Sequence, residues 1–272
     1  MQVTSWNIMH GISLQKPMNN GLPSIDSLDL INDCKTISAQ VLAVQEIDQF
    51  QYRSGNIDQA QIISSGTGLS HYRFAATVIG NPDDGKKGWQ SAADQVLDLS
   101  NPNREPRYGI GLFSALPVKA WHRWNLVGAR ITTPVLIPDE KGKPRFIWIH
   151  DEPRVVIAAE IQTELGLILF ATTHLSFVPG RNVSQFRETL RWLNQFDLPT
   201  VLLGDLNLPA NAVRFLTSYR RTKVLPTFPV KKPKVQFDHT LSTRNLEIQN
   251  ETVRQMLVGD HLALSAQIKL SS

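Results

Sequence analysis

The feature that most constrains how this sequence folds is a short apolar run that ends in two polar side chains. Residues 200–203 form a continuous hydrophobic segment, which is typical of a strand buried on both of its faces. The run stops at Gly204, and Asp205 and Asn207 follow with one residue between them. In a strand, this spacing places both side chains on the same side. The pair is suited to anchoring a metal ion or a phosphate, and a local turn that closes the strand explains it equally well.

Other apolar runs in the sequence also close with polar or ionisable residues. Each of these residues has an ordinary explanation of its own, as a turn residue, a helix cap or a hydrogen-bonded core histidine. Those explanations do not account for the repeated placement at the close of one apolar run after another. Besides Asp205 and Asn207, the residues at these positions are Asn7, Glu46, His174, Asp238, Asp260 and His261.

The order of the apolar patterns predicts an α/β protein. The chain opens with a strand at residues 2–6, continues with a helical pattern that includes Leu30 and Cys34, and returns to a strand at residues 41–44. Later patterns predict a hairpin of residues 155–162 and 167–173 and an amphipathic helix over residues 184–195. With 42% hydrophobic and 19% charged residues, and with no repeat or composition break, we expect a single domain over residues 1–272.

Two polar insertions interrupt this pattern. Residues 81–107 contain several glycines and prolines, and we expect a long surface loop there with one helical turn at residues 92–97. Residues 220–234 form a basic, proline-rich loop just before the strand that carries Asp238. The first insertion contributes Lys86, Lys87 and Trp89, and the second contains Lys231, Lys232 and Lys234 with Arg220, Arg221 and Lys223 before them.

Composition limits the cellular setting. No apolar run approaches the length of a membrane span, and the segment from Met1 onward lacks the basic and apolar pattern of an export signal. We therefore expect a cytoplasmic protein without stable membrane association. The net charge of +4 is compatible with a polyanionic partner but identifies none. The single cysteine, Cys34, shares helical spacing with apolar neighbours, so we expect a buried structural thiol.

The polar residues at the strand ends indicate metal-assisted hydrolysis. Carboxylate and carboxamide oxygens, without a cysteine cluster or closely spaced histidines, suit Mg²⁺ or Mn²⁺ rather than Zn²⁺. His174 and His261 then remain for phosphate contacts and proton transfer. The sequence has neither the glycine-rich phosphate loop of nucleotide triphosphatases nor a Gly-x-Ser-x-Gly elbow, which argues against covalent serine chemistry.

These motifs together resemble those of the endonuclease/exonuclease/phosphatase superfamily, which includes deoxyribonuclease I, exonuclease III, neutral sphingomyelinases and inositol polyphosphate 5-phosphatases. They occur in the superfamily's order from residue 4 to residue 261, so the resemblance covers essentially the whole chain. The motifs are Thr4-Ser5-Trp6-Asn7, Gln45-Glu46-Ile47, Tyr-Gly-Ile-Gly-Leu-Phe-Ser at residues 108–114, Thr173-His174-Leu175, Gly204-Asp205-Leu206-Asn207 and Gly259-Asp260-His261.

The resemblance implies a four-layer α/β/β/α sandwich, with two mixed β-sheets facing each other and helices outside. It also implies a divalent-metal-dependent phosphoester hydrolase. In such an enzyme Glu46 resembles the principal metal-binding carboxylate, with Asn7 as its supporting ligand. We expect Asp260, the acid that precedes the terminal histidine, on the metal side as well.

The same resemblance implies roles for the remaining residues. Asp205 resembles the residue that aligns or deprotonates the attacking water, with Asn207 as its partner near the phosphate. His174 and His261 are similar to the two histidines that contact the scissile phosphate. Asp238 resembles the aspartate that orients the terminal histidine.

Two positions depart from the superfamily's pattern. The superfamily usually has serine before the terminal Asp-His pair, whereas this chain has Gly259, which alters the local turn but removes no ligand. Glu152 and Arg154 fall where many members carry an acid and an arginine, and we expect them to bind substrate. Because Pro153 separates them, their register is open, and an ordinary place at the edge of a strand is the alternative for Arg154.

Nucleic acid is the substrate that the basic insertions favour, because a charged loop beside a stacking ring suits a polyanion with bases. A solvated basic loop without a partner is the alternative. A phosphatase or phosphodiesterase acting on inositol-phosphate or phospholipid head groups is the enzymatic rival, although the sequence shows no convincing membrane-facing hairpin. A non-catalytic binding protein on the same fold would be expected to have lost part of the polar set, which this chain keeps.

Overall fold

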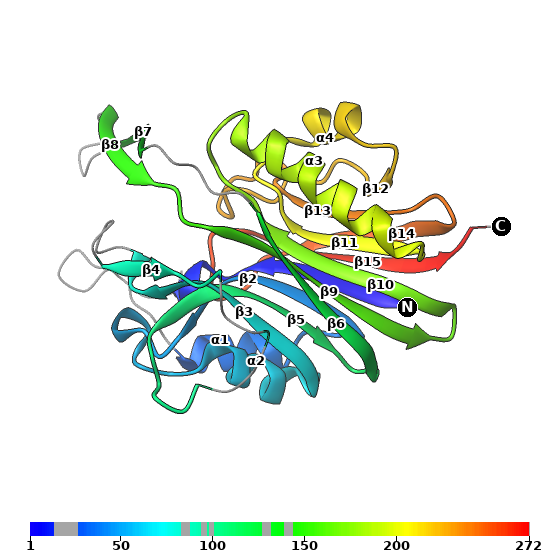
Figure 1. Ribbon diagram of the computed structural model, residues 1–272, viewed down its shortest axis with the longest axis horizontal. Helices are drawn as coiled ribbons and strands as arrows, with labels where there is room; N and C mark the ends of the chain where they lie inside the picture. Colours follow the sequence, from blue (N-terminus) through cyan, green and yellow to red (C-terminus); the bar gives the residue numbers. More distant parts are fainter. Residues whose placement is uncertain are drawn as a thin grey trace.

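The computed structural model describes residues 1–13, 27–82, 88–93, 97, 101–126, 132–138 and 144–271. Two mixed β-sheets, one of seven strands and one of six, lie face to face (Figure 1). Helices α1 and α2 cover the outer face of the first sheet, and helices α3 and α4 cover the outer face of the second. This arrangement confirms the predicted α/β/β/α sandwich.

The seven-stranded sheet is built from the N-terminal part of the chain and its last two strands. Its strand order is β14-β15-β1-β2-β5-β3-β4. Strands β1 and β2 run parallel, and the other neighbours are antiparallel. The strands are β1 (Gln2–Asn7), β2 (Val41–Gln49), β3 (His71–Gly80), β4 (Trp89–Ser91), β5 (Arg107–Ser114), β14 (Leu246–Arg254) and β15 (Ala263–Leu270).

The six-stranded sheet has the order β12-β13-β11-β10-β9-β6. Here β10 and β11 are the parallel pair, and β9 and β10 form the predicted antiparallel hairpin. Its strands are β6 (Val118–Leu126), β9 (Arg154–Thr163), β10 (Gly166–His174), β11 (Thr200–Asp205), β12 (Arg220–Arg221) and β13 (Asp238–Ser242). Strands β7 (Thr132–Pro138) and β8 (Pro144–His150) pair with each other in a separate two-stranded sheet.

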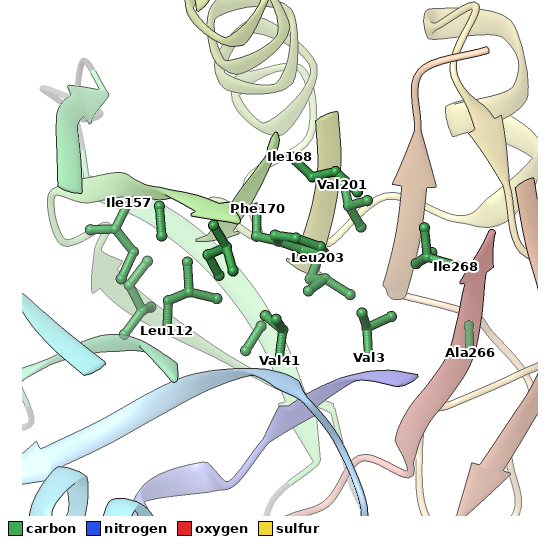
Figure 2. Packing of buried hydrophobic residues seen from close by; sticks show 14 of the residues in the cluster. Val3, Val41, Leu112, Ile157, Ile168, Phe170, Val201, Leu203, Ala266 and Ile268 are labelled. Carbon is green, nitrogen blue, oxygen red and sulfur yellow. The ribbon is translucent and has the colours of Figure 1, made fainter. Parts of the chain in front are cut away.

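The central core lies between the two sheets. Its side chains come from alternate positions of strands in both sheets, because successive residues of a strand point to opposite faces. Val3, Val41 and Leu112 of the first sheet face Ile157 and Phe170 of the second, and all five are fully or almost fully buried (Figure 2). The apolar run that begins at residue 200 supplies side chains to this core and to the helix-covered face, as the prediction of a strand buried on both faces requires.

The helices bury one apolar face each against a sheet. Cys34 is fully buried in the cluster beneath α1 and α2, as predicted for a structural thiol. The amphipathic helix predicted from residue 184 begins earlier, at Arg181, and ends in a 3-10 turn at Asn194–Phe196. The helices are α1 (Ser27–Cys34), α2 (Gln59–Thr67), α3 (Arg181–Leu193) and α4 (Ala210–Leu216). Among the described residues, no helix is long and apolar enough to cross a membrane.

The first polar insertion differs from its prediction. Residues 89–91 form strand β4 at the edge of the sheet, where Gly80 pairs with Trp89. Ala92 and Ala93, at the start of the expected helical turn, are not helical, and residues 94–96 lie outside the described residues. Lys86 and Lys87, which we expected to charge this edge, also lie outside them.

The two parallel pairs bring the predicted polar residues to one end of the sandwich. Asn7 ends β1 beside β2, and His174 ends β10 opposite Asp205, the last residue of β11. Because β13 runs antiparallel to β11, its first residue, Asp238, pairs with Asp205 at the same end. Asp238 is therefore the first residue of its strand, not the last. It lies at the site because β13 runs antiparallel to β11.

Candidate active site

A pocket of about 630 Å³ opens at this end of the sandwich. Asn7 and Asp238, which are almost fully buried, lie directly behind it and hydrogen-bond to residues of its wall. The structure thus brings every predicted site residue into one cluster. Those that line the pocket are Glu46, Glu152, Arg154, His174, Asp205, Asn207, Asp260 and His261.

Glu46 is presented by a bulge within β2, not by the end of the strand as predicted. The register against β5 shifts between Val44 and Ile47, and Glu46 has a left-handed backbone with φ 59°. A non-glycine residue in this conformation stores strain, which is common at functional sites. Burial alone would raise the pKa of Glu46, but the neighbouring His10, His174 and Asn7 hold that pKa far below its usual range. Glu46 is therefore a permanent anion at the pocket floor.

Asn7 connects the two sheets at the base of the site. Its Nδ2 donates to Glu46 Oε1 at 2.9 Å and to Asp205 Oδ2 at 3.1 Å. Its Oδ1 accepts the backbone N–H of Met9 at 3.0 Å. One buried carboxamide thus fixes the position of two carboxylates that come from different sheets.

Asp205 is the buried carboxylate at the centre of the cluster. Besides Asn7, the backbone N–H of Asn207 donates to its Oδ1 at 2.9 Å. Its Oδ2 lies 3.7 Å from Nε2 of both His174 and His261, which is too long for direct hydrogen bonds and short enough for a shared partner atom. Burial raises the pKa of Asp205 to about 6, helped by the charge of Asp238 and opposed by His261.

His261 and Asp238 form a buried ion pair. His261 Nδ1 donates to Asp238 Oδ2 at 2.7 Å, and the histidine's Nε2 faces Asp205. Burial opposes the charge of His261, but Asp238, Asp205 and Asp260 outweigh it and raise the pKa of the imidazole to about 10. His261 is therefore an imidazolium at neutral pH, with a fixed orientation.

His174 has the opposite character. Burial and the nearby charge of Arg154 lower the pKa of His174 to about 3, so the ring is neutral at physiological pH. Its Nε2 lies 3.2 Å from Nδ2 of Asn207, a left-handed residue whose amide also donates to Leu175 O at 2.9 Å. A neutral imidazole can accept such a hydrogen bond. The site therefore holds one charged and one uncharged histidine on either side of Asp205.

Arg154 forms one wall of the pocket together with acidic partners. Its Nη2 contacts Glu152 Oε1 at 2.9 Å and Asp151 Oδ1 at 3.2 Å. Burial raises the pKa of Glu152, which Arg154 partly offsets. The intervening Pro153 does not displace either residue from the pocket, and both line it.

Asp205, Asp238 and His261 form a group that could hold a metal ion, since one ligand atom from each lies within 4.8 Å of the others. Two features of this group disfavour a cation there. His261 Nδ1 is already bonded to Asp238, and the protonated ring repels a positive ion. Glu46 lies instead beside the neutral His174, with Oε1 4.0 Å from Nε2 of that ring, while Asp260 Oδ1 lies 3.9 Å from His261 Nε2.

The pocket also contains residues that the sequence did not single out. Tyr108 opens the motif at residues 108–114, and His10 follows Asn7 by three residues, so proximity to a motif was the signal for both. Arg53 and the aromatic residues carry no comparable signal, because their places depend on loops that meet only in the folded chain. The additional lining residues are Met9, His10, Arg53, Pro82, Tyr108, Phe177, Phe228 and Phe237.

The basic insertion divides into two parts. Residues 227–235 form a turn that lies against the site, because Val230 N donates to Asp260 O and the Phe228 ring lies 4.9 Å from the His261 ring. Its tip carries the exposed Lys231, Lys232 and Lys234, which we call the lysine turn. Arg220 and Arg221 instead form β12 beside Ser242 and Leu241, at the end of β13 away from Asp238.

Comparisons place these features among known proteins. The sequence matches the model of the Endonuclease/Exonuclease/phosphatase family over residues 4–261. No curated protein matches it. An endonuclease/exonuclease/phosphatase from Beutenbergia cavernae has a similar structure, with TM-score 0.64 and 18% identity over 100% of this chain and 72% of that chain.

Two further solved structures are similar over nearly their whole length. The human Nocturnin catalytic domain with bound sulfate has TM-score 0.63 and 16% identity, covering 100% of this chain and 94% of that chain. A mannosyl-6-phosphatase from Bacteroides thetaiotaomicron has TM-score 0.58 and 11% identity, covering 99% and 100%. At these identities the likeness concerns the fold alone. The family model, in contrast, spans the motifs from Thr4 to His261, and the chain therefore belongs to the endonuclease/exonuclease/phosphatase family.

Proposed function

We propose that this protein is a divalent-metal-dependent phosphodiesterase that cleaves nucleic acid. The observation that carries the proposal is the arrangement of Asp205 between the His261 imidazolium and the neutral His174, with Glu46 in the same pocket. A carboxylate whose pKa is raised to about 6 is well matched to general-base work near neutral pH. A hydrolase of this family is already supported by the family match.

The chain's own residues supply a simple mechanism. Asp205 orients a water and accepts its proton as the water attacks phosphorus, the bond from phosphorus to the leaving oxygen breaks, and that oxygen takes up a proton from solvent. His261 donates from Nε2 to a phosphoryl oxygen and stabilises the negative charge that grows there. Asp238 keeps that imidazole charged and correctly turned through the 2.7 Å hydrogen bond at Nδ1. Asn207 and Arg154, which also line the pocket, hold the phosphate.

A divalent cation fits the side of the pocket that carries Glu46. The carboxylate stays ionised because its pKa is strongly lowered, and Asp260 adds a second, partly exposed carboxylate to the same pocket, 3.9 Å from His261. Mg²⁺ and Mn²⁺ are oxygen-seeking ions of the kind such donors bind. When bound, the ion would supply Lewis-acid stabilisation of the phosphate and the leaving oxygen.

Nucleic acid is favoured over other phosphoesters by what borders the pocket. The lysine turn carries three exposed cations on the segment whose Phe228 ring contacts His261, and Phe228 and Phe237 form an aromatic pair in the pocket wall with ring centroids 5.7 Å apart. Cations that track a phosphate backbone beside rings that stack on bases are the usual elements of single-strand recognition.

A substrate panel tests the proposal. Plasmid DNA, abasic DNA, RNA, phosphoinositides, sphingomyelin and a sugar phosphate monoester are incubated with the protein under the same Mg²⁺ and Mn²⁺ conditions. We expect nucleic acid to be cleaved with the highest kcat/KM. Faster turnover of a head group or a monoester would replace the nuclease assignment with a phosphatase or lipid phosphodiesterase assignment.

A further inference from the structure

His10 occupies an unusual position at the edge of the pocket. Its backbone is left-handed, with φ 45° and ψ 28°, a conformation that costs a non-glycine residue energy. The buried Gln59 of α2 fixes this conformation, because its Nε2 donates to His10 O at 2.7 Å while its Oε1 accepts from Asp48 N at 2.8 Å. The turn is thus held by a dedicated buried carboxamide, and the imidazole is carried into the pocket with it.

The Nδ1 atom of His10 is buried and has no hydrogen-bond partner within the described part of the chain. It lies 3.8 Å from Glu46 Oε2, which exceeds the length of a hydrogen bond. Two atoms bound to one ion by bonds of about 2.1 Å lie at most about 4.2 Å apart. The separation therefore fits two ligands of one ion better than it fits a direct contact.

The other candidate donor beside Glu46, Asn7, already uses one of the two lone pairs of its amide oxygen. Asn7 directs both polar atoms of its amide to protein groups, with Oδ1 accepting from Met9 N and Nδ2 donating to two carboxylates. In contrast, when the ring carries its proton on Nε2, the lone pair of His10 Nδ1 accepts no hydrogen bond from the described residues.

We propose that His10 Nδ1 ligates the same divalent ion as Glu46, which gives this site a mixed nitrogen and oxygen donor set. This inference rests on the metal site of the proposed function. An imidazole ligand strengthens the preference for first-row transition ions over Mg²⁺, which carboxylate oxygens accept more evenly. The protein therefore binds Mn²⁺ and Co²⁺ in preference to Mg²⁺, and His10 is the residue that sets this preference.

The test uses the full-length, metal-free protein and measures metal binding rather than activity. Pulsed electron paramagnetic resonance of bound Mn²⁺ detects a directly coordinated ¹⁴N nucleus, and calorimetry gives the affinities for Mn²⁺ and Mg²⁺. His10→Asn is the variant of choice, because asparagine tolerates the left-handed backbone and removes the imidazole. His71→Asn is the matched control, since His71 is exposed at the opposite end of β3 from Pro82 of the pocket wall.

We expect the ¹⁴N coupling in the wild type and in His71→Asn, and its loss in His10→Asn. The affinity for Mn²⁺ should fall by about 10–100-fold in His10→Asn, the range known for groups that support a metal site, while that for Mg²⁺ changes less. Three results would overturn the assignment. The ¹⁴N coupling could be absent from the wild type, or it could persist in His10→Asn. It could also disappear only in His174→Gln, which would identify His174 as the nitrogen ligand.

Glu46→Gln separates this inference from the proposed function. If Glu46→Gln abolishes Mn²⁺ binding and His10→Asn leaves affinity and coupling unchanged, only the role of His10 is wrong. If Glu46→Gln binds Mn²⁺ as the wild type does, the metal site of the proposed function is itself wrong.

Discussion

At the scale of single residues, the chemistry depends on Asp205, which receives hydrogen bonds from Asn7 and Asn207 and faces two histidines. Asp205→Asn keeps the size of the side chain but removes its capacity to accept a proton. We expect kcat to fall by about 10²–10⁴-fold, the usual contribution of a general base. The fold should be retained, so the circular dichroism spectrum stays native. Full activity in a folded Asp205→Asn protein would remove Asp205 from the mechanism.

Asp238 and His261 set the pH range in which the site works. The pKa of His261 is raised to about 10, so its imidazolium persists below that pH and disappears as the pH rises through it. Asp238→Asn removes the largest charge that favours the imidazolium. The alkaline limb of the kcat/KM profile should therefore move to lower pH, with a smaller effect on the acid limb. An alkaline limb that stays in place would show that His261 does not act in its charged form.

Several single residues could be identified from the sequence because they follow apolar runs. Asp205 and His174 are of this kind, and the structure places both at strand ends that meet. Arg53 and Phe228 could not be identified, because they reach the pocket from loops whose approach depends on the assembled sandwich. The opposite charge states of His174 and His261 could not be predicted from the sequence either, because burial and neighbouring charges determine them.

At the scale of elements, the turn before Asp260 is tightly packed against the end of β1. Gly259 has φ 86°, and a Cβ there would lie 2.6 Å from Asn7 O. Glycine therefore fits this turn, where a larger residue would be strained. Gly259→Ala should destabilise the fold by about 1 kcal/mol or more, because it combines strain with a backbone clash. Urea unfolding measures this change, and Gly55→Ala is a control with similar φ and open space around the Cβ.

Gly259→Ala should also reduce activity in the protein that remains folded, since the clash pushes on the residue that holds Glu46 and Asp205. A loss of stability equal to that of Gly55→Ala would indicate that backbone strain alone matters at this turn. A stability equal to that of the wild type would contradict tight packing of Gly259 against Asn7.

Element boundaries show where local patterns stop being sufficient. The apolar run at residues 41–44 predicted a strand that ends at Glu46, yet β2 continues to Gln49. The bulge between Val44 and Ile47 is a property of pairing with β5, which no local pattern reports. Strand β4 was missed for a similar reason, because its three residues become a strand only by pairing with β3.

At the scale of the whole molecule, the fold class was predictable because motifs from residue 4 to residue 261 appear in one order. Two facing sheets leave a single shared core, which is consistent with the proposal of one domain over the chain. The substrate was not predictable to the same degree. The choice of substrate depends on the residues that surround the pocket. The two parts of the basic insertion lie at opposite ends of β13, and their positions are set by the assembled fold.

The lysine turn should therefore act on nucleic acid binding and not on the chemical step. Replacement of Lys231, Lys232 and Lys234 by serine should raise KM for nucleic acid. It should also weaken the salt dependence of binding: the slope of log K against log salt concentration should fall by up to about 0.9 for each phosphate that is no longer neutralised. Hydrolysis of a small phosphodiester should not change. The matched control replaces Arg220 and Arg221 at the far end of β13. An equal effect of both sets would indicate a general charge effect rather than a binding surface.

The pocket as a whole is assigned to phosphodiester hydrolysis with a divalent ion, and hydrolysis of bis-p-nitrophenyl phosphate tests this assignment most directly. Metal-free protein is assayed alone, with Mg²⁺ and with Mn²⁺, and Asp205→Asn serves as the control for contaminating enzymes. We predict turnover that requires the added ion, is reversed by a chelator and is nearly absent from Asp205→Asn. No turnover with any divalent ion, or equal turnover in the two proteins, would contradict the assignment and favour a binding protein on this fold.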